Sequence, residues 1–293
     1  MAQRSNRFLA VLTAAIAVAL MAAAAAMAAR VVGDNGPNVL TGTDQRDVIL
    51  AKGGDDTVNA LAARDFVRAG QGADSVNAGR GRDVVLGGEG DDTLNGDEGR
   101  DVIAGNAGAD TLNGGLGCDR IFAGPDDDTI DGGPGGAAIR YRFRHFRGFR
   151  CERLHGGLGN DTSSGGAGRD FMSGGKGDDT QSGGAGADKI FANRGRDKSD
   201  GGDGPDILWA LSRFDVTAIG DPDGDELTGG AGRDLFRVRD GEVDLVHCGE
   251  GRDHVLADQF DAVDNDCEHV DRRDVTSLGE VDDQEENQTE DPS

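Results

Sequence analysis

The sequence predicts an all-β repeat fold, in which glycine-rich turns alternate with short strands. The first observation is an Asp at every ninth position, from Asp47 to Asp128 and again from Asp161 to Asp215. The second is a stretch of six turn-forming residues in each unit, followed by three residues with an apolar centre. The third is a difference between alternate units, which doubles the period to 18 residues. A fixed period of this kind indicates an architecture in which each unit stacks on its neighbours.

Each unit consists of a turn and a strand. Eight units carry the strict pattern Gly-Gly-x-Gly-x-Asp, and Gly allows the backbone angles and close approaches that such turns need. These units begin at Gly87, Gly114, Gly156, Gly165, Gly174, Gly183, Gly201 and Gly229. An apolar residue stands two positions after the Asp, where we expect it to point inward. These residues include Ile49, Val58, Val67, Val76, Val85, Leu94, Ile103, Leu112, Ile121 and Ile130.

The composition does not support an ordinary globular core. The 293 residues include 50 Gly and only 4% aromatic residues, and the net charge is −25. Gly loses the most backbone entropy on folding, and repulsion between carboxylates adds to the cost. Without a bound cation, such a chain should be largely disordered. The charge also argues against nucleic acid as a partner, because phosphate binding needs a basic surface.

The regular carboxylates predict that the turns bind cations. Calcium takes about six to eight oxygen ligands from carboxylates and backbone carbonyls. One turn is too small to supply that many, whereas two stacked turns suffice. The candidate metal ligands are Asp56, Asp65, Asp74, Asp83, Asp92, Asp101, Asp110, Asp119, Asp128, Asp161, Asp170, Asp179, Asp188, Asp197, Asp206, Asp225 and Asp234.

Units such as GGEGDDTLN (87–95) and GGAGADKIF (183–191) resemble the RTX nonapeptide family of secreted calcium-binding proteins. The family consensus is Gly-Gly-x-Gly-x-Asp-x-apolar-x, and the resemblance covers roughly residues 33–256. It implies a parallel β-roll with 18-residue coils, each made of two nonapeptides, and multiple calcium ions between turns 18 residues apart. Asp47 would then face Asp65, and Asp56 would face Asp74.

Some units depart from the consensus. The units that end in Asp47, Asp65 and Asp128 lack the third Gly, and Asn38 stands in place of an Asp. The replacements of that Gly are Gln45, Ala63 and Asp126. Metal binding at these four units is therefore in question. Asp215 stands in a unit that has lost every Gly, which makes it a poor ligand candidate.

Alternate units also differ in the residues beside the inward position. One set has Thr or Ser after the Asp and Asn two places further on, as in Thr93 and Asn95. The other set has mainly apolar residues there, as in Val84 and Leu86. Because side chains alternate along a strand, one outer face should be a polar ladder and the opposite one apolar. The apolar face admits three explanations, namely β-propensity, a docking surface, or cover by the insert or the acidic tail.

The first residues predict a targeting segment. Arg4 and Arg7 precede an apolar run from Phe8 to Ala29, and Ala26-Met27-Ala28 offers a cleavage site. The run is also long enough for an uncleaved anchor. In both cases the remainder faces the outside, so we expect a secreted, extracellular protein that has no membrane contact once the segment is cleaved. The expected segments are a signal peptide (1–29), a first β-roll segment (30–135), a basic aromatic insert (136–155), a second β-roll segment (156–256), a small C-terminal cap (257–273) and a disordered acidic tail (274–293).

The four cysteines fit an extracellular location, where disulfides persist. Cys118 and Cys151 bracket the interruption in the repeats, and Cys248 and Cys267 lie in one closing stretch. We favour the pairs 118–151 and 248–267 among the three possible connectivities. The stretch 248–268 also looks like the two-cysteine ending of RTX-type secreted proteins.

The insert offers a second functional hypothesis. Its Arg residues alternate with Tyr and Phe, a pattern that can bind an anionic polymer on a cell surface. Alternatively, these Arg side chains lie on the carboxylates of the chain's own acidic body. The candidate polyanion-binding residues are Arg140, Arg142, Arg144, Arg147 and Arg150.

The sequence favours a calcium-binding structural or surface-interaction protein over an enzyme. It contains neither a His-Glu-x-x-His helix motif nor a Gly-x-Ser-x-Gly elbow. Its five His show no metal-ligand spacing. We therefore expect no catalytic residues, with calcium as the cofactor and an adhesin or polyanion-binding module as the alternative.

Overall fold

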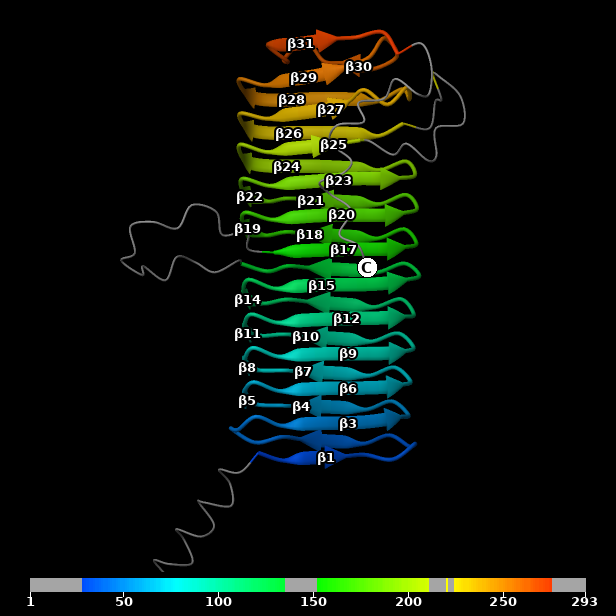
Figure 1. Ribbon diagram of the computed structural model, residues 1–293, viewed down its shortest axis with the longest axis vertical. Helices are drawn as coiled ribbons and strands as arrows, with labels where there is room; N and C mark the ends of the chain where they lie inside the picture. Colours follow the sequence, from blue (N-terminus) through cyan, green and yellow to red (C-terminus); the bar gives the residue numbers. More distant parts are fainter. Residues whose placement is uncertain (1–27, 135–151, 211–219, 221–223, 276–293) are drawn as a thin grey trace, which may run out of the picture.

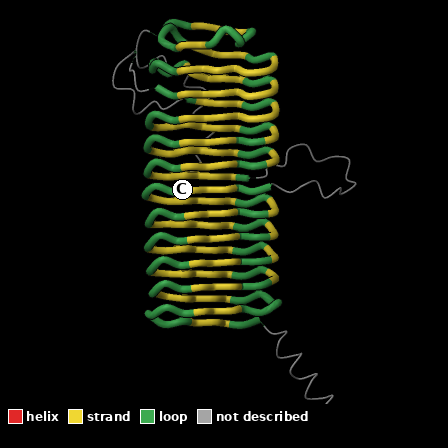
Figure 2. The backbone as a smooth tube through the Cα atoms, turned by 180° about the vertical axis from the view of Figure 1, so that it is seen from behind, coloured by secondary structure: helices red, strands yellow, loops and turns green. Residues whose placement is uncertain are grey.

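The computed structural model describes residues 28–134, 152–210, 220 and 224–275. These residues form an elongated solenoid of two parallel sheets, in which each coil adds one strand to each sheet (Figures 1 and 2). Neighbouring coils pair in a register of 18 residues, as in Val48 with Phe66 and Thr57 with Ser75. The expected all-β parallel β-roll is therefore confirmed.

The first sheet, which we call sheet A, has thirteen strands. They are β1 (Arg30–Val32), β3 (Val48–Gly53), β6 (Phe66–Gln71), β9 (Val84–Glu89), β12 (Val102–Ala107), β15 (Arg120–Pro125), β17 (Arg153–Leu158), β20 (Phe171–Lys176), β23 (Lys189–Arg194), β25 (Ile207–Trp209), β27 (Leu235–Val238), β29 (His254–Ala257) and β31 (His269–Arg272).

The second sheet, sheet B, runs along the opposite side of the coils. Its main path contains β2 (Val39–Thr41), β4 (Thr57–Asn59), β7 (Ser75–Asn77), β10 (Thr93–Asn95), β13 (Thr111–Asn113), β16 (Thr129–Asp131), β18 (Thr162–Ser164), β21 (Thr180–Ser182), β24 (Lys198–Gly204), β26 (Glu226–Gly232), β28 (Leu245–Gly251) and β30 (Ala262–Val263). Two-residue strands pair within the turns. They are β5 (Ala62–Ala63), β8 (Arg80–Gly81), β11 (Glu98–Gly99), β14 (Leu116–Gly117), β19 (Ala167–Gly168) and β22 (Ala185–Gly186).

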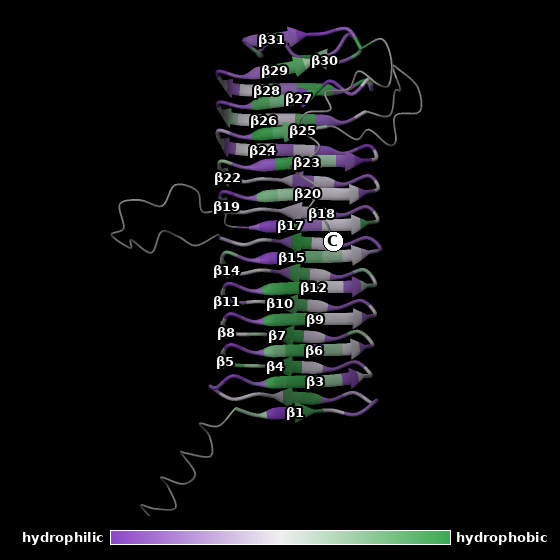
Figure 3. Cartoon of the chain, in the orientation of Figure 1, coloured by the Kyte–Doolittle hydropathy of each residue, from purple (hydrophilic) through white to green (hydrophobic). Residues whose placement is uncertain are grey.

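The core is a column of the inward residues between the two sheets. Each predicted inward residue from Ile49 to Ile130 is buried. In the second half, Met172, Ile190 and Leu208 continue the column on the side of sheet A. On the side of sheet B, buried polar residues such as Gln181 and Ser199 take the same positions. Apolar colour accordingly dominates the strands of the N-terminal half (Figure 3).

The two outer faces differ as the alternation predicts. Sheet B carries the Thr and Asn ladder, and the side-chain amide of Asn95 donates to Oδ1 of Asn77 (3.0 Å). Sheet A carries Val48, Val84 and Val102 at the equivalent positions. The two chemically distinct columns therefore follow from the 18-residue repeat.

The two β-roll segments stack without a break. Strand β15 pairs directly with β17, and β16 pairs directly with β18. Strand β17 begins at Arg153, so residues 153–155, which were expected to belong to the insert, lie in the solenoid. The reason is that Glu152 keeps the nine-residue spacing to Asp161. Residues 135–151 lie outside the described part of the chain.

A disulfide closes the C-terminal end. Cys248 and Cys267 are bonded at 1.95 Å, which confirms this predicted pair. A covalent loop of this length contributes on the order of 3 kcal/mol by restricting the unfolded chain. Cys118 is also disulfide-bonded, and Cys151 lies outside the described residues. Within the described ranges, no helix is long and apolar enough to cross a membrane.

Candidate metal centre

Two rows of acidic residues run the length of the solenoid, one before each sheet. Each residue stands at the end of a turn, directly before a strand. Row A precedes sheet A and contains Asp47, Asp65, Asp83, Asp101, Asp119, Glu152, Asp170, Asp188, Asp206, Asp234, Asp253 and Glu268. Row B precedes sheet B and contains Asp56, Asp74, Asp92, Asp110, Asp128, Asp161, Asp179, Asp197, Asp225, Asp244 and Asp261.

One carboxylate oxygen of each row residue holds the neighbouring coil. The N–H of Asp56 donates to Oδ1 of Asp74 (2.7 Å), and the N–H of Asp74 donates to Oδ1 of Asp92 (2.8 Å). Row A repeats this contact, with Asp47 donating to Asp65 at 2.6 Å. The predicted facing of Asp47 with Asp65 and of Asp56 with Asp74 is therefore confirmed.

The second oxygen of nearly every row residue is buried without a hydrogen-bond donor. This holds for Oδ2 of Asp74, Asp92 and Asp179, each of which is at most 2% exposed. Such orphaned oxygens are rare, because a buried acceptor without a partner costs about 1–3 kcal/mol. A continuous series of them indicates that something other than a protein donor satisfies these oxygens.

The first Gly of the pattern leaves room for that partner. A Cβ at Gly87 would lie 2.3 Å from Oδ2 of Asp92 and 2.7 Å from the carbonyl oxygen of Gly105. A Cβ at Gly174 would meet Oδ2 of Asp179 and the carbonyl oxygen of Ala192 at 2.2 and 2.9 Å. Carboxylate and carbonyl oxygens from adjacent coils thus converge on one space. A hard cation is the partner that such an all-oxygen set prefers.

Burial makes these carboxyl groups resist ionisation while no cation is bound. Desolvation is the largest cause, and it raises the pKa of Asp92, Asp101 and Asp179 to about 7 each. Neighbouring carboxylates raise the pKa further, whereas the hydrogen bond from the adjacent backbone lowers it. Desolvation likewise raises the pKa of Glu152 to about 9 and that of Asp225 to about 10. A cation that binds near neutral pH must therefore displace protons.

All the predicted metal-binding residues lie in these two rows, and each is buried. Two of the questioned units keep the turn conformation, because Ala63 and Asp126 adopt the left-handed φ angles (86° and 85°) that the missing Gly would supply. Asp47 differs, since both of its carboxylate oxygens accept hydrogen bonds from Thr43. Its carboxylate is already satisfied, as the loss of the Gly pattern in its turn suggested. Asp215 lies outside the described residues.

Glu152 is a row member that was absent from the predicted ligands. It is fully buried, its Oε2 accepts from the N–H of Asp119 (2.6 Å), and its N–H donates to Asp170 (2.9 Å). It carries row A across a separation of 33 residues instead of 18. The spacing of nine residues to Asp161 could have identified it, but the change from Asp to Glu concealed it.

The last row members were also missed, because extra residues lengthen the final coils. Asp244 and Asp253 lie 19 residues after their row neighbours. The turn before Asp244 also has Asp240 and Glu242 where the repeat usually has Gly. One oxygen from each of these three residues lies within 4.8 Å of the others, and all three are buried. Row B thus gains carboxylate oxygens near its C-terminal end.

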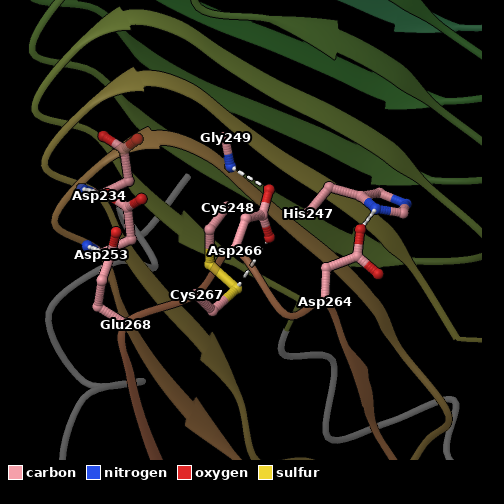
Figure 4. Close-up of a disulfide and its surroundings, with 9 residues drawn as sticks. All are labelled: Asp234, His247, Cys248, Gly249, Asp253, Asp264, Asp266, Cys267 and Glu268. Carbon is pink, nitrogen blue, oxygen red and sulfur yellow. Dashed lines mark hydrogen bonds and ion pairs between the residues drawn. A yellow bond between two sulfur atoms is a disulfide. The ribbon is translucent and has the colours of Figure 1, made fainter.

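The end of row A lies beside the disulfide (Figure 4). The N–H of Asp234 donates to Asp253 (2.9 Å), and that of Asp253 donates to Glu268 (2.8 Å). Glu268 directly follows Cys267. The disulfide therefore fixes the last carboxylate of row A against the coil before it.

The family model for the RTX calcium-binding nonapeptide repeat matches eight overlapping stretches of the sequence. They are residues 32–67, 51–85, 68–103, 86–121, 104–136, 155–180, 174–208 and 217–242. Together these stretches cover more than half of the chain. The chain belongs to the RTX calcium-binding repeat family. A search of curated proteins found no match.

Membership of this family identifies the cation. RTX nonapeptide repeats bind calcium, and the orphaned oxygens of the two rows fit multiple calcium ions. When bound, calcium supplies the positive charge that the buried carboxylates lack. The residues of the chain supply the rest, namely one oxygen that holds the next coil and one that faces the cation. This is a calcium-binding structural fold, of a kind that is typically not catalytic.

Proposed function

We propose that this protein is a secreted β-roll whose folding is coupled to calcium, with a structural or surface-interaction role. The observation that carries the proposal is the series of buried carboxylate oxygens without donors in both rows. These oxygens come together only when the coils stack. Calcium binding and folding should therefore be one event, because the unfolded chain has no preformed site. The apolar run from Phe8 to Ala29 supports secretion.

Calorimetric titration of the chain without residues 1–29 tests this function. We expect many calcium ions per chain, bound with the large heat of a folding transition. Magnesium is the matched control, because its small shell needs near-octahedral geometry and it loses water reluctantly. It should produce little folding at the same concentration. Binding of a single calcium ion, or no heat at all, would contradict the proposal.

The basic aromatic insert supports a second candidate function, namely adhesion to an anionic cell-surface polymer. Its Arg residues contrast with the net charge of −25 of the whole chain. Residues 135–151 lie outside the described part of the structure, so this candidate rests on sequence alone. We expect retention on an anionic polymer to fall when Arg142, Arg144 and Arg147 are changed to Ser.

The matched control for this experiment changes the exposed Arg46, Arg64 and Arg82 to Ser, which removes the same charge from the solenoid. If retention falls equally in both variants, or in neither, the insert is not the binding element. Raising the salt concentration should release the unchanged protein, because exposed charges are screened beyond about 10 Å at 0.1 M salt.

A further inference from the structure

A row of aromatic rings runs along the outer face of sheet A in the second half of the solenoid. Phe122, His155, Phe171, Phe191 and Trp209 form this row, which we call the aromatic stripe. Successive ring centroids lie 5.5, 6.2, 5.0 and 4.3 Å apart. Distances of about 4.5–7 Å are typical of interacting aromatic pairs, and the last pair is slightly closer. The stripe is therefore a continuous apolar surface.

Cationic side chains accompany the stripe. The Arg153 guanidinium lies 5.3 Å from the ring centre of Phe171, and the Lys189 ammonium lies 5.0 Å from that of Trp209. Arg237 lies 5.4 Å from the Trp209 ring on the next strand. These contacts fall within the range of cation–π attraction. A positive, aromatic strip thus lies on a protein whose net charge is −25.

The central rings of the stripe are shielded from solvent although they project from the outer face. Phe171, Phe191 and Trp209 are only 5–8% exposed, whereas Phe122 at the end of the stripe is 44% exposed. On sheet B, the outward Thr residues from Thr57 to Thr180 are exposed at equivalent positions. Position in the sheet alone does not account for this difference. The central stripe therefore has a cover.

We propose that the C-terminal segment 276–293 docks along the aromatic stripe. The segment contains seven Asp and Glu residues and lacks Lys and Arg, so its charge complements Arg153, Lys189 and Arg237. It also contains Leu278 and Val281, which can contact the rings. The basic insert is the wrong occupant, because its Arg residues would face the cations of the stripe.

The chain leaves the solenoid within reach of the stripe. Val275 is buried in the last coil, where its N–H donates to Oε1 of Gln259 and its carbonyl accepts from Nε2, both at 2.7 Å. Strand β25, which carries Trp209, lies three strands from β31, and β20, which carries Phe171, lies five strands away. At about 4.8 Å per strand, these are separations of about 14 and 24 Å. Eighteen extended residues span up to about 60 Å.

Trp209 provides the measurement, because it is the only tryptophan in the chain. The calcium-loaded mature chain is compared with a variant that ends at Val275. We expect the shortened protein to show red-shifted Trp emission and several-fold stronger quenching by acrylamide, with unchanged strand content by circular dichroism. A synthetic peptide of residues 276–293, added in excess, should reverse both changes.

Two full-length variants separate charge from chain length. Changing Glu280, Asp282, Asp283, Glu285 and Glu286 to their amides should expose Trp209 as the truncation does. Changing Gln284, Asn287 and Gln288 to Ser keeps the charge and should leave Trp209 protected. Salt at about 1 M, which screens charges beyond about 3 Å, should expose Trp209 only in chains that keep the acidic segment.

Unchanged emission and quenching after truncation would overturn the proposal. If Trp209 then stayed protected at every protein concentration, the cover would be residues 211–219 of the same chain. If dilution exposed it, the cover would be a second copy. A calcium titration of the shortened chain keeps this test separate from the proposed function, since the truncation leaves both acidic rows intact.

Discussion

Removal of calcium is expected to convert this protein from a strand-rich solenoid into a disordered chain. Each orphaned carboxylate oxygen costs about 1–3 kcal/mol while it lacks a partner. The total stability of a folded domain is only about 5–15 kcal/mol, so the two rows of such oxygens exceed it several-fold. Far-UV circular dichroism in EDTA at pH 8 should show a disordered spectrum. Strand signal should return at about 10⁻⁴–10⁻³ M calcium, the range of extracellular calcium modules.

The same experiment has a pH dependence of defined sign. The pKa of row residues such as Asp92 and Asp101 is raised from 3.8 to about 7 in the metal-free fold, mainly by desolvation. The folded state then holds more protons than the unfolded chain between about pH 4 and 7. Its stability without calcium is greatest below that window and falls as the pH rises through it. In EDTA, strand content should therefore be higher near pH 4 than at pH 8.

Calcium reverses this dependence. It binds the deprotonated carboxylates, so protons compete with it, and the calcium midpoint of folding should rise as the pH falls from 8 towards 6. Magnesium and sodium at matched ionic strength control for simple charge screening. Identical spectra in EDTA and in calcium at pH 8 would falsify the coupling of folding to calcium.

The periodic part of the fold was predictable because one physical rule repeats in every unit. The alternation of side chains along a strand places Val76 inward and Thr93 outward without further information, and the structure confirms both. The facing of Asp56 and Asp74 followed from the family resemblance, and the 18-residue period agrees with it. These features depend only on residues close together in the sequence.

Features that depend on long-range stacking were not predictable. Glu152 joins row A only because β15 pairs with β17 across the interruption, and the sequence does not state where the chain returns. The shielding of Trp209 likewise depends on segments far apart in the chain. At Asp47, the hydrogen bonds from Thr43 satisfy the oxygen that was expected to face a cation, and the loss of Gly at position 45 was the only sign of it.

Substitution of the first Gly of a unit is expected to disable the calcium sites beside it. In Gly87→Ala, the new methyl group would lie 2.3 Å from Oδ2 of Asp92 and 2.7 Å from the carbonyl oxygen of Gly105. Asp92 can move aside only by giving up its hydrogen bond from Asp74, and the carbonyl belongs to the backbone. We expect a loss of about 1–3 kcal/mol, typical of overpacking. Calorimetry should show fewer bound calcium ions and a higher calcium midpoint.

Gly53→Ala is the matched control. Gly53 also lies in the solenoid and is buried, but a Cβ there would meet its nearest atom, the carbonyl oxygen of Gln71, at 3.7 Å, which is ordinary contact. Neither Gly53 nor Gly87 has a positive φ angle, so backbone strain does not separate the two variants. Equal calcium stoichiometry and equal midpoints in both variants would show that the space beside Gly87 is not reserved for a cation. A loss confined to Gly87→Ala would locate the calcium ion between the carboxylate of one coil and the carbonyl of the next.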